Sequence, residues 1–223
     1  MKNDFDSIAF DRAERSFLGR VYQWMAAGLA LTGFVALAVA SNPAFLRALS
    51  GGLFFLLMIV EIGLVIWLSA RIQHLSMGAA LTGFLVYSAL NGMTLSFLFA
   101  VYTGASIALT FFVTAGTFAG VSLFGALTKT DLGSMRGYLF MGLIGVILAS
   151  VVNIFLHSSA LYWILTYAGL AVFIGLTAYD TQRLKALQRS GASDQVAILG
   201  ALTLYLDFIN MFVLLLRIFG RRR

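Results

Sequence analysis

Three acidic side chains interrupt the long apolar stretches of this sequence, namely Glu61, Asp180 and Asp207. Asp207 lies about halfway along the last stretch, residues 196–217, which is long enough to cross a bilayer. A carboxylate at that depth costs roughly 2.5–3.5 kcal/mol on insertion scales, and acids in such places are usually functional. The only neighbouring span that carries another aspartate ends at Asp180. We therefore predict that these two aspartates form a pair.

A pair of this kind has a limited set of chemical uses. Two carboxylates held close together in a low dielectric cannot both ionise at low cost, so the pair shares one proton and gains charge as pH rises. It can sense pH, relay protons or bind a cation, and oxygen ligands suit a hard ion such as Ca²⁺. Thr203 and Asn210 lie on the same helical face as Asp207 and add oxygen-bearing groups. Asn91, in an earlier span, is predicted to extend this polar lining.

The composition shows what kind of protein must position these groups. The chain is 61% apolar and 11% charged, whereas soluble proteins are about 45–50% apolar and about 25% charged. The absence of cysteine excludes disulfide and thiolate chemistry. The net charge of +6 lies mostly in loops and tails, which indicates membrane orientation and argues against a nucleic-acid partner. The sequence therefore predicts an all-α integral membrane protein.

Seven apolar runs predict seven transmembrane helices, since each run is close to the about 20 residues that a bilayer core requires. Their expected ranges are 21–40, 53–70, 77–102, 106–127, 137–156, 161–180 and 196–219. A basic loop, residues 182–194, is expected between the last two spans. The organisation is then a polar cytoplasmic segment, residues 1–20, one membrane domain, residues 21–219, and a basic tail, residues 220–223.

The distribution of Lys and Arg predicts a cytoplasmic N-terminus. With the N-terminus inside, the inner side holds Lys2, Arg12, Arg15, Arg20, Arg71, Lys129, Arg136, Arg183, Lys185 and Arg189. The outer side then holds Arg47 and the tail residues 221–223, all arginine. This tail contradicts the rule, so either it is an exception or the last span is not a simple crossing. In this topology Arg71 and both aspartates fall in the cytoplasmic half of the membrane.

The same residues also have purely structural interpretations. Asp207 could bond only to a neighbouring backbone group or an arginine. Asp180 could be solvated, or paired with Arg183 three residues further on. Glu61 is equally compatible with a role in a pore and with an interhelical hydrogen bond, and Asn91 suits an interhelical bond. The sequence leaves these alternatives open.

Two motifs close the sixth span and fill the seventh. The first is Ala178-Tyr-Asp-Thr-Gln182, and the second is Leu204-Tyr-Leu-Asp-Phe-Ile-Asn-Met-Phe212. Together they resemble the signature of the Bax inhibitor-1 (transmembrane Bax-inhibitor-motif) family in its bacterial form. The resemblance covers nearly all seven spans, including Glu61 and the segment Asn91-Gly-Met-Thr-Leu95.

This resemblance implies a multi-pass protein of the bacterial inner membrane, with the last helix wrapped by the other six. It implies a pH-sensitive Ca²⁺ leak gated by an aspartate pair, which Asp180 and Asp207 match by motif. No cofactor is implied besides the Ca²⁺ that is bound or transported. An arginine latch in the second span is also implied, for which Arg71 is the candidate. Its spacing from Glu61 is one residue shorter than the resemblance predicts.

Four functions fit these features to different degrees: a cation leak, a protease, a regulatory partner and a transporter. The favoured one is a cation leak in the lipid bilayer, closed at low pH by a shared proton and an arginine pairing and opened by deprotonation. An intramembrane aspartyl protease would fit Tyr179-Asp180, but Leu204 and Leu206 stand where its glycines would flank the second aspartate, and Pro43 is the only proline. A membrane partner that regulates a protease or a stress-response complex would use the acids only for packing. A proton-coupled transporter would use the same acids, but the sequence reveals no pocket for an organic substrate.

Overall fold

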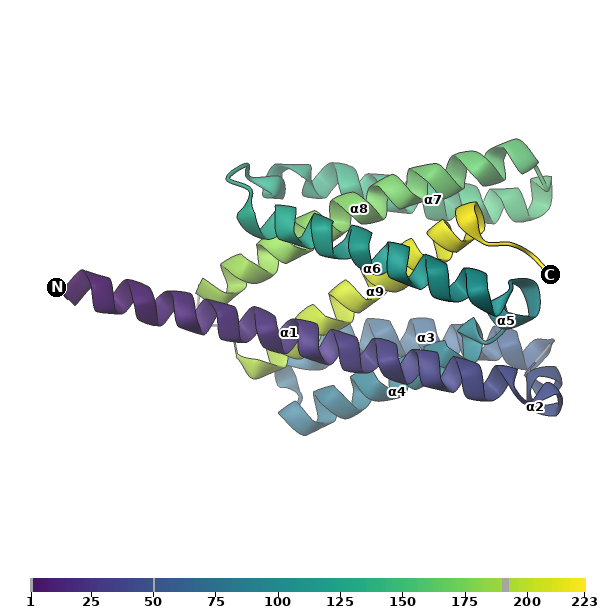
Figure 1. The fold of residues 1–223 in the computed structure, drawn as a ribbon, viewed down its shortest axis with the longest axis horizontal. Helices are drawn as coiled ribbons and strands as arrows, with labels where there is room; N and C mark the ends of the chain where they lie inside the picture. The colour runs from purple at the N-terminus through teal and green to yellow at the C-terminus, as the bar shows by residue number, and fades with distance from the viewer. Residues whose placement is uncertain (1, 50, 190–192) are drawn as a thin grey trace. The chain divides into compact units, whose positions relative to one another are not determined.

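The computed structural model is all-helical and describes residues 2–49, 51–189 and 193–223 (Figure 1). Seven long helices form most of it: α1 (Lys2–Ala40), α3 (Gly52–Arg71), α4 (Met77–Leu95), α6 (Gly104–Leu127), α7 (Arg136–Leu156), α8 (Ser159–Arg189) and α9 (Asp194–Phe219). Short helical segments join them: α2 (Pro43–Ala48), η1 (Ile72–His74), α5 (Leu98–Val101) and η2 (Leu132–Met135). Asn42 caps α2, because its side chain accepts hydrogen bonds from the first amides of that helix.

The predicted number and order of membrane spans are confirmed. Seven stretches of the described chain are long and apolar enough to cross a membrane: Phe17–Ala40, Gly52–Arg71, Met77–Val101, Gly104–Leu127, Leu132–Leu156, Ser159–Gln188 and Gln195–Phe219. They match the expected runs with shifts of a few residues at most ends. The larger shifts are at the start of the fifth span and the end of the sixth, and the helices of the first and third spans also differ from their expected forms.

The predicted end of the sixth span is wrong. α8 continues past Asp180 to Arg189, so most of the expected loop, residues 182–194, is helical, and residues 190–192 lie outside the described part. The residues after Asp180 favour a helix, and Leu184 is buried, so packing stabilises the extra turns. Asp180 therefore lies more than two turns inside a helix instead of at its end.

The first and third spans also differ from their expected forms. α1 begins at Lys2, so the backbone of the polar N-terminal segment belongs to the same helix as the first span. The third span is interrupted between α4 and α5, where Ser96 is fully buried. The Ser96 hydroxyl donates to the Met93 carbonyl over 2.6 Å, which satisfies a backbone acceptor at the end of α4.

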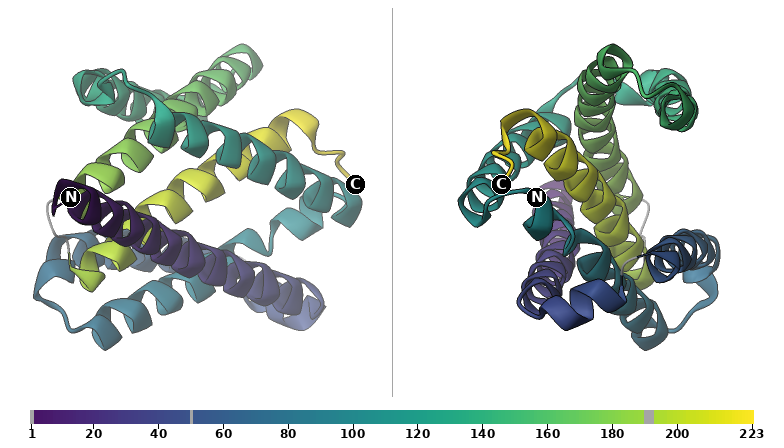
Figure 2. Two further views of the ribbon diagram at one scale, coloured as in Figure 1. Left: turned by 60° about the vertical axis from the view of Figure 1, so that its left-hand side comes forward. Right: turned by 90° about the vertical axis from the view of Figure 1, so that its right-hand side faces the viewer.

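The helices form two compact units, which are described separately. The first unit comprises residues 1–103, 187–205 and 222–223. In it α1 packs along α4, and the two helices lie side by side in Figures 1 and 2. A Cβ at Gly92 would lie 2.7 Å from the Thr32 carbonyl oxygen, so only glycine permits this backbone approach.

The second unit comprises residues 104–186 and 206–221, and includes α6, α7, α8 and the second half of α9. α6 meets α8 where a Cβ at Gly125 would collide with the Ala178 carbonyl oxygen. α9 packs on α6 through Phe208, whose ring lies 5.4 Å from that of Phe111 and 5.5 Å from that of Phe118 in edge-on geometry.

α9 is the most buried of the seven membrane-spanning helices. Protein covers 72% of its apolar stretch, against 6–33% for the other six. The expectation that the last helix lies inside the bundle is confirmed. Its first half belongs to the first unit and its second half to the second.

The arginine tail lies beside the turn that joins the third and fourth spans. In the first unit, Arg222 forms an antiparallel bridge with Tyr102, and the Arg223 amide donates to the Val101 carbonyl over 3.0 Å. In the second unit, the Arg221 amide donates to the Ser106 hydroxyl over 3.0 Å. In the topology predicted from charge this turn is on the outer side, so a simple crossing of α9 would make the tail an exception to the charge rule.

We expect the substitution Gly125→Ala to destabilise the protein by about 1–3 kcal/mol, because backbone atoms of α8 would have to move. The matched control is Gly116→Ala on the same helix, where a Cβ meets no atom within 4 Å. That change should be neutral or stabilising by up to about 1 kcal/mol. Denaturant titration in detergent, followed by tryptophan fluorescence, measures both. Equal stability of the two variants would contradict the close contact.

Candidate functional site

The two aspartates singled out in the sequence lie in the same unit. Asp180 is on α8 and Asp207 is on the second half of α9, and their exposed fractions are 7% and 5%. The Asp180 carboxylate is close enough to that of Asp207 for the two charges to interact. The structure therefore brings together two buried acids from adjacent spans, which we call the aspartate pair.

One oxygen of Asp207 has no hydrogen-bonding partner. Its Oδ2 atom is buried and unbonded among the described residues, and no basic side chain of the described chain forms an ion pair with it. A buried, unsatisfied carboxylate oxygen costs free energy and usually marks a place where a proton, a water molecule or an ion is bound. Asp207 is therefore not a packing residue with a satisfied side chain.

Asp180 has different surroundings. Arg183 Nη1 lies 3.9 Å from Asp180 Oδ1, and the Arg136 charge also acts on this carboxylate. The Arg183 side chain is 52% exposed, so this long ion pair is well screened and weak. The anticipated pairing with Arg183 is thus present. This ion pair supplies a counter-charge to Asp180, and it supplies none to Asp207.

Two buried hydroxyl groups of the same unit also lack hydrogen-bonding partners within the described part of the chain. They are Ser122 Oγ on α6 and Thr181 Oγ1 on α8. Ser122 precedes Gly125 by one turn and Thr181 follows Ala178 by one turn, so the two residues flank the contact between α6 and α8. Sequence reasoning missed both. Thr181 had a signal, since it follows Asp180 in the motif, whereas nothing in the sequence distinguished Ser122.

Thr203 and Asn210 use their side chains locally. The Thr203 hydroxyl donates to the Leu199 carbonyl over 3.0 Å, and the Asn210 amide donates to the Leu206 carbonyl over 2.8 Å. Each bond links the side chain to its own helix one turn earlier. Both residues share the helical face of Asp207, as the spacing requires, but their role as ligands stays a prediction.

Glu61 belongs to a separate hydrogen-bonded group in the first unit. The Asn91 amide donates to Glu61 Oε2 over 3.3 Å, and the Thr94 hydroxyl donates to Glu61 Oε1. The Asn91 carbonyl oxygen in turn accepts a bond of 3.1 Å from the Tyr205 hydroxyl. Both carboxylate oxygens of Glu61 therefore have hydrogen-bonding partners, in contrast to Oδ2 of Asp207, which has none among the described residues.

The chain of bonds continues through Tyr205, which is fully buried. Its hydroxyl lies 2.7 Å from the Thr32 hydroxyl, which lies 2.8 Å from the Ser88 carbonyl oxygen. We call Glu61, Asn91, Thr94, Tyr205 and Thr32 the Glu61 cluster; it links α1, α3, α4 and α9. Sequence reasoning missed Tyr205 and Thr32, although Tyr205 stands in the motif beside Leu204.

The structure assigns no partner that would make Arg71 a latch. This residue is exposed in the last turn of α3, and it forms no ion pair among the described side chains of its own unit. The latch therefore stays a prediction that rests on the family resemblance.

The aspartate pair is a sparse ligand set for a cation. Among the described residues, no three His, Cys, Asp or Glu side chains lie close enough together to hold a metal ion. A tightly bound Ca²⁺ takes about 6–8 oxygen ligands. Two carboxylates supply at most four oxygen atoms, so the aspartate pair alone falls short of that number.

Comparison with known proteins places this arrangement in a family. Residues 14–223 match the family described as Inhibitor of apoptosis-promoting Bax1. The chain is 52% identical over 227 residues to the inner membrane protein YbhL of Escherichia coli, covering 98% of this chain and 97% of the relative. An uncharacterized protein of Borreliella burgdorferi is 42% identical over 217 residues, with 94% of each chain covered. An uncharacterized protein of Rickettsia prowazekii is 40% identical over 219 residues, covering 96% of this chain and 93% of the relative. The chain belongs to the Bax inhibitor-1 family of membrane proteins.

Proposed function

We propose that this protein is a pH-sensitive cation leak of the bacterial inner membrane, with Ca²⁺ as the expected ion and the aspartate pair as its gate. One observation carries the proposal: Asp207 Oδ2 is buried without a partner while the Asp180 carboxylate acts on it. The name of the Escherichia coli relative supports the location, since it is an inner membrane protein. The charge distribution supports a cytoplasmic N-terminus.

In the proposed closed state, at low pH, the aspartate pair holds a proton on the unpartnered oxygen of Asp207. The pair then carries one negative charge, which Arg183 and Arg136 balance from the side of Asp180. With only one negative charge in the pair, no repulsion between carboxylates acts to separate the two helices. A single charge that arginines balance also attracts a cation only weakly. The leak is therefore low.

Loss of that proton adds a second buried negative charge beside the first. Two like charges in a poorly solvated site repel each other strongly, because the local dielectric is low. The repulsion favours separation of α8 and α9 around the pair, and the added charge lowers the cost of bringing in a divalent cation. Flux should therefore rise as pH rises. In this proposal the acids bind and release protons and cations, and they cleave no bond.

Unpartnered hydroxyl groups offer further oxygen atoms along the path. Ser122 and Thr181 are buried in the same unit as the pair, and their oxygens are free to accept a bond from water or to face a cation. We include them in the lining, with Thr203 and Asn210 as the neighbours of Asp207 along α9.

The Glu61 cluster has a different role in this proposal. Glu61 and Asn91 serve as a junction that fixes α3 and α4 to α9, because the carboxylate of Glu61 is fully hydrogen-bonded to neutral groups. A satisfied polar network of this kind holds helices in one register. Arg71 is the candidate for the arginine latch that the family resemblance implies.

We expect Asp207→Asn to abolish the pH dependence of Ca²⁺ flux into liposomes. Wild-type flux should increase by up to about tenfold per pH unit through the transition, since one proton controls it. The variant lacks the ionisable group and should keep a constant flux. Asp131→Asn is the matched control: this exposed acid caps η2 through its Oδ1 atom, and asparagine caps equally well. The gate assignment is wrong if Asp207→Asn and wild type share one pH profile.

We expect Ser122→Ala and Thr181→Val to lower Ca²⁺ flux at high pH by about fivefold or more, because each removes one oxygen from the path. The pH at which flux is half-maximal should not change, since the aspartate pair is intact. Ser150→Ala on α7 is the control, because the Ser150 hydroxyl is exposed and bonds to its own helix. Unchanged flux in both variants would remove these residues from the path.

We expect Glu61→Gln and Tyr205→Phe to affect stability and to leave the pH profile of flux unchanged. In Glu61→Gln, one carboxylate oxygen becomes an amide donor that faces the existing donors from Asn91 and Thr94. The free energy of unfolding should therefore fall by about 1–3 kcal/mol. Tyr205→Phe loses the bond to Asn91 and should cost about 1 kcal/mol. Denaturant titration and liposome flux test both variants. A shifted pH profile at unchanged stability would make the Glu61 cluster part of the gate.

A further inference from the structure

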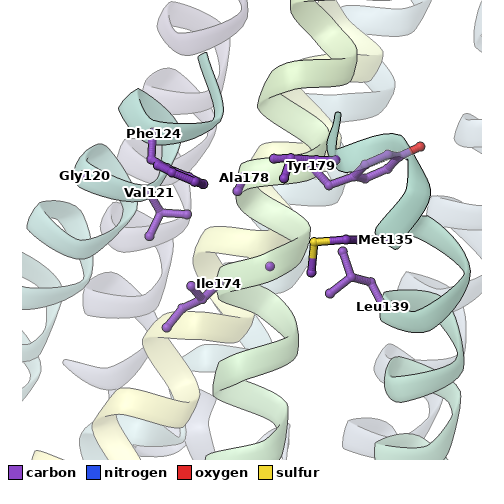
Figure 3. A pocket seen from close by; sticks show the side chains of 10 residues that line it. Gly120, Val121, Phe124, Met135, Leu139, Ile174, Ala178 and Tyr179 are labelled. Atoms are coloured by element: carbon purple, nitrogen blue, oxygen red, sulfur yellow. The ribbon is translucent and has the colours of Figure 1, made fainter. Parts of the chain in front are cut away.

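The second unit contains an apolar slot beside the end of α6, the start of α7 and the part of α8 that precedes Asp180. The slot has a volume of about 280 Å³ and crosses one face of α8 between α6 and α7. In Figure 3, Phe124 of α6 lies on one side of α8, and Met135 and Leu139 lie on the other. The Tyr179 ring extends toward the second side with its hydroxyl outermost. The walls are almost entirely hydrocarbon, so the slot suits an apolar occupant.

The loop at the end of the slot is held in place by one side chain. Gln182 Oε1 accepts a bond of 2.8 Å from the Leu132 amide, and Gln182 Nε2 donates to the Thr130 carbonyl over 2.8 Å. These two bonds attach η2 to α8. Leu132 itself lines the slot, so the hydrogen bonds of Gln182 fix the position of this wall.

Basic side chains surround this same end. Arg136 directly follows Met135 and begins α7, while Arg183 follows Tyr179 by one turn on α8. Both arginines are exposed, and Lys129 lies exposed in the loop between α6 and η2. Two acids offset part of this charge: Asp180, on which both arginines act, and Asp131, which is exposed in the same loop as Lys129. The end of the slot therefore carries an excess of positive charge.

We propose that this slot binds one acyl chain of an anionic phospholipid, whose phosphate is held by Arg136 and Arg183. An apolar wall that ends in exposed arginines complements a hydrocarbon chain attached to a negative headgroup. Basic pockets between transmembrane helices on the cytoplasmic side suit anionic lipid headgroups for this reason. Arginine suits a phosphate because its guanidinium donates two parallel hydrogen bonds.

The lipid site stands independently of the proposed leak, but it touches the same charges. Phosphate oxygens would compete with Asp180 for the guanidinium of Arg183, which now lies 3.9 Å from that carboxylate. If the proposed function holds, the leak should respond to the fraction of anionic lipid. Binding itself is measured without any flux, so failure of one proposal can be told from failure of the other.

The test is lipid titration of the full chain in detergent, followed by native mass spectrometry. The probes are phosphatidylglycerol, phosphatidylethanolamine with identical acyl chains, and inorganic phosphate. We expect one phosphatidylglycerol to be retained in preference to phosphatidylethanolamine. Arg136→Gln and Arg183→Gln should each weaken phosphatidylglycerol binding about fivefold, and the double variant about 25-fold, with little effect on phosphatidylethanolamine. Both arginines are exposed, so these variants should fold.

A second pair of variants tests the slot itself. Gly120 lines it, and a Cβ there meets no atom within 4 Å, so Gly120→Leu should fill the slot without displacing backbone. Gly116→Leu, one turn earlier on α6 and equally unobstructed, is the control. Only the first should lose the retained lipid. Equal retention of both phospholipids, unchanged binding in the arginine variants, or unchanged binding in Gly120→Leu would overturn the proposal. Displacement of the lipid by inorganic phosphate alone would also overturn it, because the site would then recognise a free anion.

Discussion

The structure depends on keeping the polar groups of α9 away from lipid. In hydrocarbon, a carboxylate or a phenol hydroxyl has no water to bond to, so it must be enclosed by protein. α9 carries both kinds of group, Asp207 and Tyr205, two residues apart and thus on nearly opposite faces of the helix. No single neighbouring helix can cover two opposite faces. The burial of 72% of this span, far above that of the other six, follows from this constraint.

Glu61 and Asp207 differ in how the protein offsets the free-energy cost of burying a carboxylate. At Glu61 both carboxylate oxygens accept bonds from neutral donors, and the network ends in the hydroxyls of Tyr205 and Thr32. At Asp207 one oxygen has no partner, and the nearest interacting charge has the same sign. A satisfied acid stabilises one arrangement of helices, whereas an unsatisfied acid has a free energy that depends on proton and cation binding. In the proposed function, this contrast distinguishes Glu61, which fixes helices in place, from Asp207, which responds to pH.

The second unit places three features close together, beside the start of α7 and the interior of α8. Asp180, the arginines that act on it and the mouth of the apolar slot all lie within about two turns of α7 and α8. The continuation of α8 to Arg189 makes this possible, because it sets Arg183 one turn from the slot and beside Asp180 on a continuous helix. With a loop after Asp180, as the hydropathy predicted, Arg183 would have had no defined position.

The sequence by itself determined the class of protein, the seven spans and the two aspartates, because apolar length and rare buried charges are local properties that a bilayer makes decisive. The family resemblance carried by the motif around Asp207 also implied that the last helix is interior. Only the tertiary structure decided which acid is satisfied, since the partners of Glu61 come from residues 30 and more positions away. The unpartnered hydroxyls of Ser122 and Thr181, the two hydrogen bonds of Gln182 to residues 130 and 132, and the slot likewise depend on contacts between segments that are distant in sequence. Such contacts arise from packing, and no periodicity along a single helix encodes them.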